Sequence, residues 1–196
     1  MPDVMQQGVQ AFAYAGTVTR DLAIFCGTLL VFVLAAAWLL VLAAQRARLT
    51  FAMAVRIALL LVVAYLAAKV LSHVILDPRP YLVDHVTPLA HVSRDNGFPS
   101  DHTLLAAALT ASLMWIARRW IAVFALGTLL VMLGRLGIGA HHTIDVLGSV
   151  AIVVVVALVV AAFALPAAWN TPLLARRLPG RAGGTAGPRP RGADRR

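Results

Sequence analysis

The chain has 196 residues, of which 61% are hydrophobic, and its mean hydropathy is +0.85. This composition excludes a soluble domain of the same length, which would be about half apolar. The formal charge of +9 does not indicate nucleic-acid binding, because the arginines gather in a C-terminal tail and beside apolar runs instead of forming one face. The single cysteine, Cys26, excludes a disulfide framework within the chain.

The apolar runs predict an all-α integral membrane protein with five transmembrane helices in a bundle and an N-terminal interfacial helix. Residues 1–20 are mildly amphipathic and too polar to cross a bilayer, so we expect them to lie at its surface. The runs that follow approach the length of about 20 apolar residues that a bilayer requires, although the third is short. The expected spans cover residues 22–44, 51–76, 102–117, 120–133 and 143–165.

Polar and basic residues fill the connections between the expected spans. Residues 77–99 contain four prolines and are predicted to form a polar loop, and Arg135 is expected in a short connection after the fourth span. Residues 171–196 are rich in glycine, proline and arginine, a composition typical of disorder. We therefore expect a membrane domain at residues 1–170, followed by a disordered basic tail.

The distribution of arginine predicts the orientation in the membrane. With five spans, the tail and two basic connections share one side, and the positive-inside rule places that side in the cytoplasm. The polar loop at residues 77–99 and the residues around Arg135 then face the periplasm or the cell exterior. On the cytoplasmic side, the arginines outside the tail are Arg46, Arg48, Arg56, Arg118 and Arg119.

Three polar clusters lie at the outward ends of the spans, where ionisable groups are costly unless they serve a function. In the last cluster, His141 and Asp145 are four residues apart, so a helix beginning near His141 would bring them into contact. A carboxylate bonded to one imidazole nitrogen fixes the tautomer and leaves the other nitrogen free to attack. Such a pair can also simply tie helix ends together. The position of Arg135, six residues upstream, favours the catalytic interpretation.

The second cluster, Pro99-Ser100-Asp101-His102, opens the third expected span. Ser100 is a candidate N-cap, and the free N–H groups at a helix start attract anions. His102 in the first turn can donate a proton to a leaving oxygen. A plain helix cap, with Asp101 favoured by the helix dipole, would give the same pattern.

The first cluster places Arg79 between Pro78 and Pro80, which nearly fixes its backbone direction. A guanidinium held in this way can grip a phosphate with two hydrogen bonds. Lys69 lies ten residues earlier in the second span, as either a phosphate contact or a side chain that extends to the membrane surface. Two arginines, two histidines and an aspartate at one membrane face together predict the capture and cleavage of a phosphate ester.

The three clusters resemble the motifs of the type 2 phosphatidic acid phosphatase superfamily, which read K-x6-R-P, P-S-G-H and S-R-x5-H-x3-D. Here Gly134 replaces the serine of the third motif, Asp101 replaces the glycine of the second, and Lys69 stands three residues too far upstream in the first. The similarity covers roughly residues 20–165. The sequence is similar in particular to one branch of this superfamily, the undecaprenyl-diphosphate phosphatases associated with bacitracin resistance. The segments similar to that branch are residues 77–81, 98–103 and 141–148.

This resemblance implies a membrane phosphatase that converts undecaprenyl diphosphate to undecaprenyl phosphate and phosphate through a phosphohistidine, in a bacterial inner membrane. His141 would be the nucleophile, Asp145 its orienting partner and His102 the general acid. No metal or other cofactor is implied, and the partners are the polyprenyl diphosphate lipid and the bilayer. The groups that would bind phosphate are Arg79, Ser100, Asp101, Arg135 and Lys69.

Other functions fit parts of the same pattern. A phosphatase or phosphotransferase acting on phosphatidylglycerophosphate, phosphatidate or lipid A is the alternative among enzymes. A small transporter would place polar residues at mid-bilayer depth, whereas here they collect at one end of the spans. A scaffold without activity would not need the intact set of His141, Asp145 and His102. The sequence has no H-x-x-x-H or comparable metal-ligand spacing.

Overall fold

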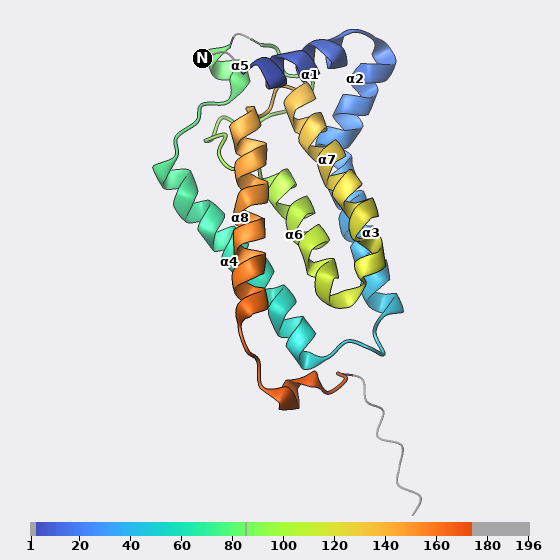
Figure 1. Ribbon diagram of the computed structural model, residues 1–196. Coiled ribbons are helices and arrows are strands. Elements are labelled where there is room, and N and C mark those ends of the chain that lie inside the picture. Colours follow the sequence, from blue (N-terminus) through green and yellow to red (C-terminus); the bar gives the residue numbers. More distant parts are fainter. Residues whose placement is uncertain (1–2, 85, 174–196) are drawn as a thin grey trace, which may run out of the picture.

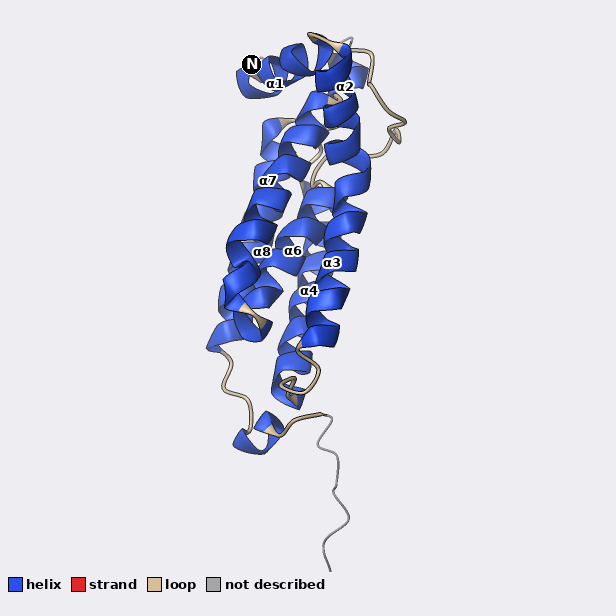
Figure 2. Cartoon of the chain, turned by 90° about the vertical axis from the view of Figure 1, so that its right-hand side faces the viewer, coloured by secondary structure: helices blue, strands red, loops and turns tan. Residues whose placement is uncertain are grey.

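A computed structural model describes residues 3–84 and 86–173, and within these ranges every regular element is helical (Figures 1 and 2). The predicted all-α class is therefore confirmed. The predicted tail lies outside the described residues, apart from residues 171–173. The helices are α1 (Val4–Tyr14), α2 (Thr17–Ile24), η1 (Phe25–Leu29), α3 (Leu30–Ala44), α4 (Phe51–Val74), α5 (Pro80–Val83), α6 (Asp101–Ile116), η2 (Arg118–Trp120), α7 (Ile121–Gly137), α8 (Thr143–Ala162) and η3 (Ala167–Asn170).

Four stretches of helix are long and apolar enough to cross a membrane, and each corresponds to an expected span. The remaining expected span is α6, which has 16 residues and lies among the other four in Figure 1. That the chain crosses the membrane five times therefore stays a prediction, as does the placement of α1 at a membrane surface. The four long stretches are Thr17–Ala44, Phe51–Val74, Arg118–Gly137 and Thr143–Ala162.

The short helix α6 is central because both of its sides are buried. One side packs with α4 and α8, where Ala107 and Ala108 belong to a buried apolar cluster. The other side packs with α3 and α7, where Ala106 and Leu113 belong to a second cluster. The three alanines let the helix backbones approach closely, as small residues commonly do where helices associate in a bilayer. The start of α6, which carries Ser100 as its cap and His102 in its first turn, is thus held between α4, α8, α3 and α7.

Several predicted boundaries are wrong. The first long helical stretch begins at Thr17 instead of residue 22, and the expected loop at residues 77–99 contains the short helix α5. Arg135 lies in the last turn of α7 and not in a connection. Its helix continues because the guanidinium donates to the carbonyl oxygen of Gly27 at 3.0 Å, so this polar group is satisfied inside the bundle.

The contact between η1 and α7 depends on two glycines. A Cβ atom at Gly134 would lie 2.3 Å from the backbone nitrogen of Gly27, and a Cβ atom at Gly27 would lie 2.7 Å from the carbonyl oxygen of Gly134. Both obstacles are backbone atoms, so a methyl group cannot be accommodated by a side-chain rotation. The close approach places the Gly27 carbonyl group within reach of Arg135.

We expect Gly134→Ala to destabilise the bundle by about 1–3 kcal/mol, because it overpacks a backbone-to-backbone contact. The measurement is thermal unfolding of the detergent-solubilised protein, with a midpoint several degrees lower as the expected result. Gly8→Ala is the matched control, since a Cβ atom there would meet nothing within 4 Å. Equal midpoints for the two variants would contradict the tight contact.

The two ends of the bundle differ in chemistry. At the end where α4 begins and α8 finishes, Arg56 donates to the carbonyl oxygens of Val160 at 2.7 Å and Phe163 at 2.9 Å, and so caps α8. The opposite end carries α1, α5 and the loop that follows α5 (Figure 1). The arginine, histidine and aspartate clusters meet at that second end.

Candidate active site

His141 and Asp145 form a buried pair at the start of α8. The Nδ1 atom of His141 lies 3.2 Å from Oδ2 of Asp145, and the backbone N–H of His142 donates to the same oxygen at 2.9 Å. His141 is 2% exposed and Asp145 is fully buried. The predicted contact between residues four apart is therefore confirmed. The pair forms because the chain turns into α8 with His142 as the N-cap residue.

Two guanidinium groups converge on the other ring nitrogen of His141. The Nε2 atom lies 3.2 Å from an Nη atom of Arg79 and 3.1 Å from an Nη atom of Arg135. A guanidinium can only donate hydrogen bonds, so Nε2 must offer its lone pair. The ring proton is then on Nδ1, where the Asp145 carboxylate accepts it. The surroundings thus fix one tautomer, with the lone pair directed toward two cations.

Arg79 is held on several sides. It pairs with Asp95 at 2.7 Å and donates to the carbonyl oxygen of Ala140 at 3.0 Å. Its loop is built around Asn96, whose side chain accepts from the backbone of Asp77 and donates to carbonyl oxygens at residues 72, 75 and 98. Arg79 is only 6% exposed, so its direction is fixed before any ligand arrives.

One hydrogen-bond donor of Arg135, its Nε–H group, has no acceptor among the described residues. Its two Nη atoms bond to Gly27 and His141, whereas its Nε atom is buried and has no partner among the described residues. A buried charged donor without an acceptor is costly. An anion bound beside His141 would offset that cost, because its oxygens can accept from both Arg135 and Arg79.

The His141 ring is kept neutral. Burial, followed by the positive charges of Arg135 and Arg79, holds the pKa of His141 well below the ordinary histidine range. A positive charge on His102 would lower it further. Since Nε2 is unprotonated at neutral pH, it is available as a nucleophile.

The second cluster begins α6 as expected. Ser100 is the N-cap residue, and its hydroxyl oxygen accepts from the backbone N–H of Thr103, so that prediction is confirmed. The backbone N–H of Ser100 donates to the carbonyl oxygen of Asp145 at 3.4 Å, which ties α6 to α8. Asp101 is exposed in the first turn, and the His102 ring meets Phe32 edge-on at 6.2 Å between centroids.

Lys69 lies apart from these groups. Its ammonium group sits over the ring of Tyr65, 5.5 Å from the centroid, on an exposed part of α4. The sequence places it about one helical turn further from Arg79 than the family motif does, and the structure gives it no contact with Arg79 or His141. Its role as a phosphate ligand stays a prediction.

Sequence reasoning missed a second polar layer behind His141. The ring of His142 lies between Asp77 and Asp84, at 3.1 Å and 3.2 Å. An oxygen of Asp77, a ring nitrogen of His142 and an oxygen of Asp145 lie within 4.8 Å of one another, so the ring stands beside two carboxylates. Gly97 allows the close packing here, since a Cβ atom on it would lie 3.0 Å from Oδ2 of Asp145. The doublet His141-His142 and the aspartate before Arg79 were the available signals.

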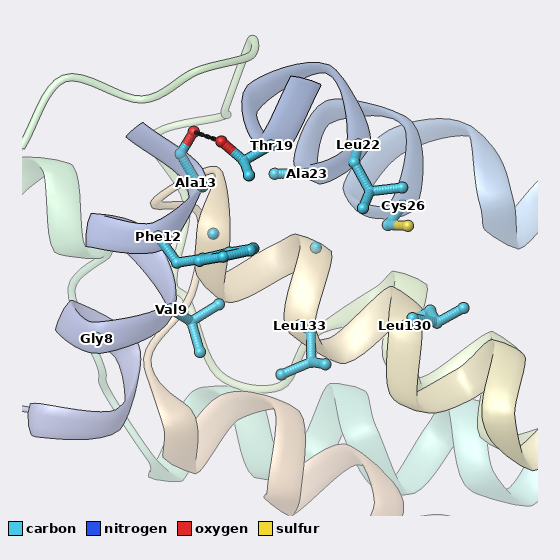
Figure 3. A pocket seen from close by; sticks show the side chains of 12 residues that line it. Gly8, Val9, Phe12, Ala13, Thr19, Leu22, Ala23, Cys26, Leu130 and Leu133 are labelled. Atoms are coloured by element: carbon cyan, nitrogen blue, oxygen red, sulfur yellow. Dashed lines mark hydrogen bonds between the residues drawn. The ribbon is translucent and has the colours of Figure 1, made fainter. Parts of the chain in front are cut away.

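An apolar cavity of about 330 Å³ lies beside the site, between α1, α2 and α7 (Figure 3). Phe12, Leu22 and Leu133 line it, one from each of the three helices. Gly134 also lines it, next in sequence to Arg135. The cavity can accommodate hydrocarbon, and it borders the helix turn that carries a phosphate-binding candidate.

The bundle and its polar end define a membrane protein in which a buried, neutral histidine directs its lone pair at two guanidinium groups, an arrangement suited to phosphoryl chemistry. The PAP2 superfamily model matches residues 53–169, more than half of the chain. The chain belongs to the PAP2 superfamily and is a phosphatase of this family.

Two individual proteins are similar to the chain. The undecaprenyl-diphosphatase BcrC of Bacillus subtilis (strain 168) is 31% identical over 96 residues, which cover 49% of this chain and 48% of BcrC, so the match spans about half the length of that relative. The crystal structure of Aquifex aeolicus LpxE aligns with a TM-score of 0.62 and 16% identity, covering 81% of this chain and 93% of LpxE. The second likeness shows a shared fold.

Proposed function

We propose that the protein hydrolyses undecaprenyl diphosphate to undecaprenyl phosphate and inorganic phosphate, with His141 as the nucleophile. The observation that carries the proposal is the convergence of Arg79 and Arg135 on Nε2 of His141, at 3.2 Å and 3.1 Å. A terminal phosphate bound by both guanidinium groups would bring its phosphorus close to the lone pair. The similarity to BcrC supports the choice of a polyprenyl diphosphate.

The residues suggest how the reaction proceeds. The phosphate oxygens replace Nε2 as the acceptors of the two guanidinium groups, and Nε2 attacks phosphorus in line as the bond to the leaving lipid phosphate breaks. His102 donates a proton to the leaving oxygen. Asp145 stabilises the positive charge that develops on the His141 ring. Water then attacks the phosphohistidine with His102 as the base, and phosphate and the neutral ring are released.

The surroundings of the site support a lipid substrate. The long apolar helices keep the polyprenyl chain in the bilayer, and the cavity between α1, α2 and α7 can receive part of it. The basic residues at the far end of the bundle favour a cytoplasmic position for that end, which would turn the site toward the periplasm or cell exterior. There the enzyme would recycle the carrier lipid released during cell-wall synthesis.

The experiment is phosphate release by the detergent-purified protein in EDTA, with undecaprenyl diphosphate, phosphatidate, phosphatidylglycerophosphate and lipid A compared at equal concentration. We expect the fastest release from undecaprenyl diphosphate and no loss of rate in EDTA. Faster release from another lipid would contradict the proposed substrate. Complete loss in EDTA, restored by a divalent metal, would contradict the mechanism.

A further inference from the structure

The two adjacent histidines stand in opposite environments. Nε2 of His141 faces only cations, whereas both ring nitrogens of His142 face carboxylates, Nδ1 toward Asp77 at 3.1 Å and Nε2 toward Asp84 at 3.2 Å. A ring with an acceptor at each nitrogen donates from both and is therefore an imidazolium. Neighbouring groups driven to opposite protonation states commonly divide the work at an active site.

Asp145 needs a positive charge beside it. Its Oδ2 accepts from His141 and from the backbone of His142, whereas its buried Oδ1 has no partner among the described residues. Asp77 offers an oxygen within 4.8 Å of the Asp145 ligand atom, and two carboxylates this close repel each other unless a cation or a proton intervenes. The His142 ring, with a side chain 14% exposed, is the cation in contact with this group.

We propose that His142 is a positioning residue for the reaction at His141: held as an imidazolium between Asp77 and Asp84, it offsets the charge of Asp145 and, through its backbone N–H, fixes the oxygen that orients the nucleophile. The inference rests on the proposed function of His141. It assigns a task to a side chain that touches neither the reacting atoms nor the two arginines.

The charges around His142 predict the direction of its pH dependence. Burial lowers the pKa of His142, but the hydrogen bond to Asp84 and the charges of Asp77 and Asp145 outweigh it, so the pKa is raised. Asp3, which caps the start of α8 through Thr143, adds a fourth carboxylate on this side. The cation is present below this raised pKa and is lost as the pH rises through it. Activity that depends on His142 should therefore fall at the alkaline end.

The test compares wild type, His142→Gln and Asp84→Asn on whichever lipid phosphate the wild type hydrolyses. We expect His142→Gln to lower kcat by up to about 100-fold with little change in KM, because a nucleophile that is oriented less precisely reacts more slowly while the phosphate contacts remain. We expect Asp84→Asn to shift the alkaline limb of kcat to lower pH, because it removes the negative charge that faces Nε2 and stabilises the imidazolium. His91→Gln, at an exposed histidine of the same end, is the matched control.

A second readout does not depend on activity. In protein labelled with ¹⁵N-histidine, with resonances assigned from the variants, we expect His142 to titrate above the ordinary value of about 6.5 and to titrate lower in Asp84→Asn. Titration at or below that value, or a kcat of His142→Gln equal to wild type, would overturn the proposal. Failure of the wild type to hydrolyse undecaprenyl diphosphate would affect only the proposed substrate.

Discussion

His141→Gln is expected to lower phosphate release by about 10⁴-fold or more, because the proposed covalent intermediate forms on the imidazole that this substitution removes. Glutamine is the suitable replacement, since its side-chain oxygen can still accept hydrogen bonds from Arg79 and Arg135, and the buried charges keep a partner. The measurement is the initial rate of phosphate release in detergent and EDTA, with His141→Ala alongside.

The control for this prediction is His91→Gln, which removes an exposed imidazole from the loop at the same end of the bundle. It should retain wild-type activity. Thermal unfolding of each variant separates loss of chemistry from loss of fold. If His141→Gln folds and releases phosphate as fast as the control, His141 is not the nucleophile and the phosphohistidine mechanism is wrong.

Much of the fold could be predicted because its long helices coincide with runs of apolar residues. The positions of α3, α4 and α8 follow from length and hydropathy alone. The boundaries of the helices were less predictable. A polar residue near a helix end can belong to the following loop, or it can stay in the helix when a group distant in sequence forms a hydrogen bond with its side chain. Arg135 extends α7 because it bonds to Gly27, 108 residues earlier in the chain.

The core of the site could also be predicted, since His141 and Asp145 are local partners at a helix start. The layer behind them could not. The contacts of His142 with Asp77 and Asp84 span 65 and 58 residues, and no periodic pattern links those positions. The same holds for the convergence of Arg79 and Arg135, which depends on how α7 packs against η1 and on the loop that Asn96 organises.

One departure from the family motif has a structural reason. Glycine stands at residue 134, where the motif has serine, and a Cβ atom there would lie 2.3 Å from the backbone of Gly27. The glycine therefore belongs with the π-helical turn η1, which lies outside the part of the chain matched to the superfamily. In this protein η1 supports the candidate site, because its Gly27 carbonyl oxygen is the acceptor that holds Arg135.

Arg135→Lys is expected to reduce kcat about 10²- to 10³-fold, the range seen when one preorganised donor to a developing charge is lost. Lysine keeps the positive charge, but a single ammonium group cannot bond to Gly27, His141 and a phosphate oxygen in the geometry that the planar guanidinium provides. The loss should therefore exceed what charge alone explains. The measurement is kcat and KM on the preferred lipid phosphate.

Arg94→Lys is the matched control, because Arg94 is an exposed arginine in the loop that also carries Asp95 and Asn96. It tests whether any arginine near this end of the bundle responds to the same exchange, and we expect it to retain full activity. Activity of Arg135→Lys within about twofold of Arg94→Lys would mean that position 135 supplies only charge. The buried Nε atom, the bond to Gly27 and the glycine contact behind it would then serve the fold and not the transition state.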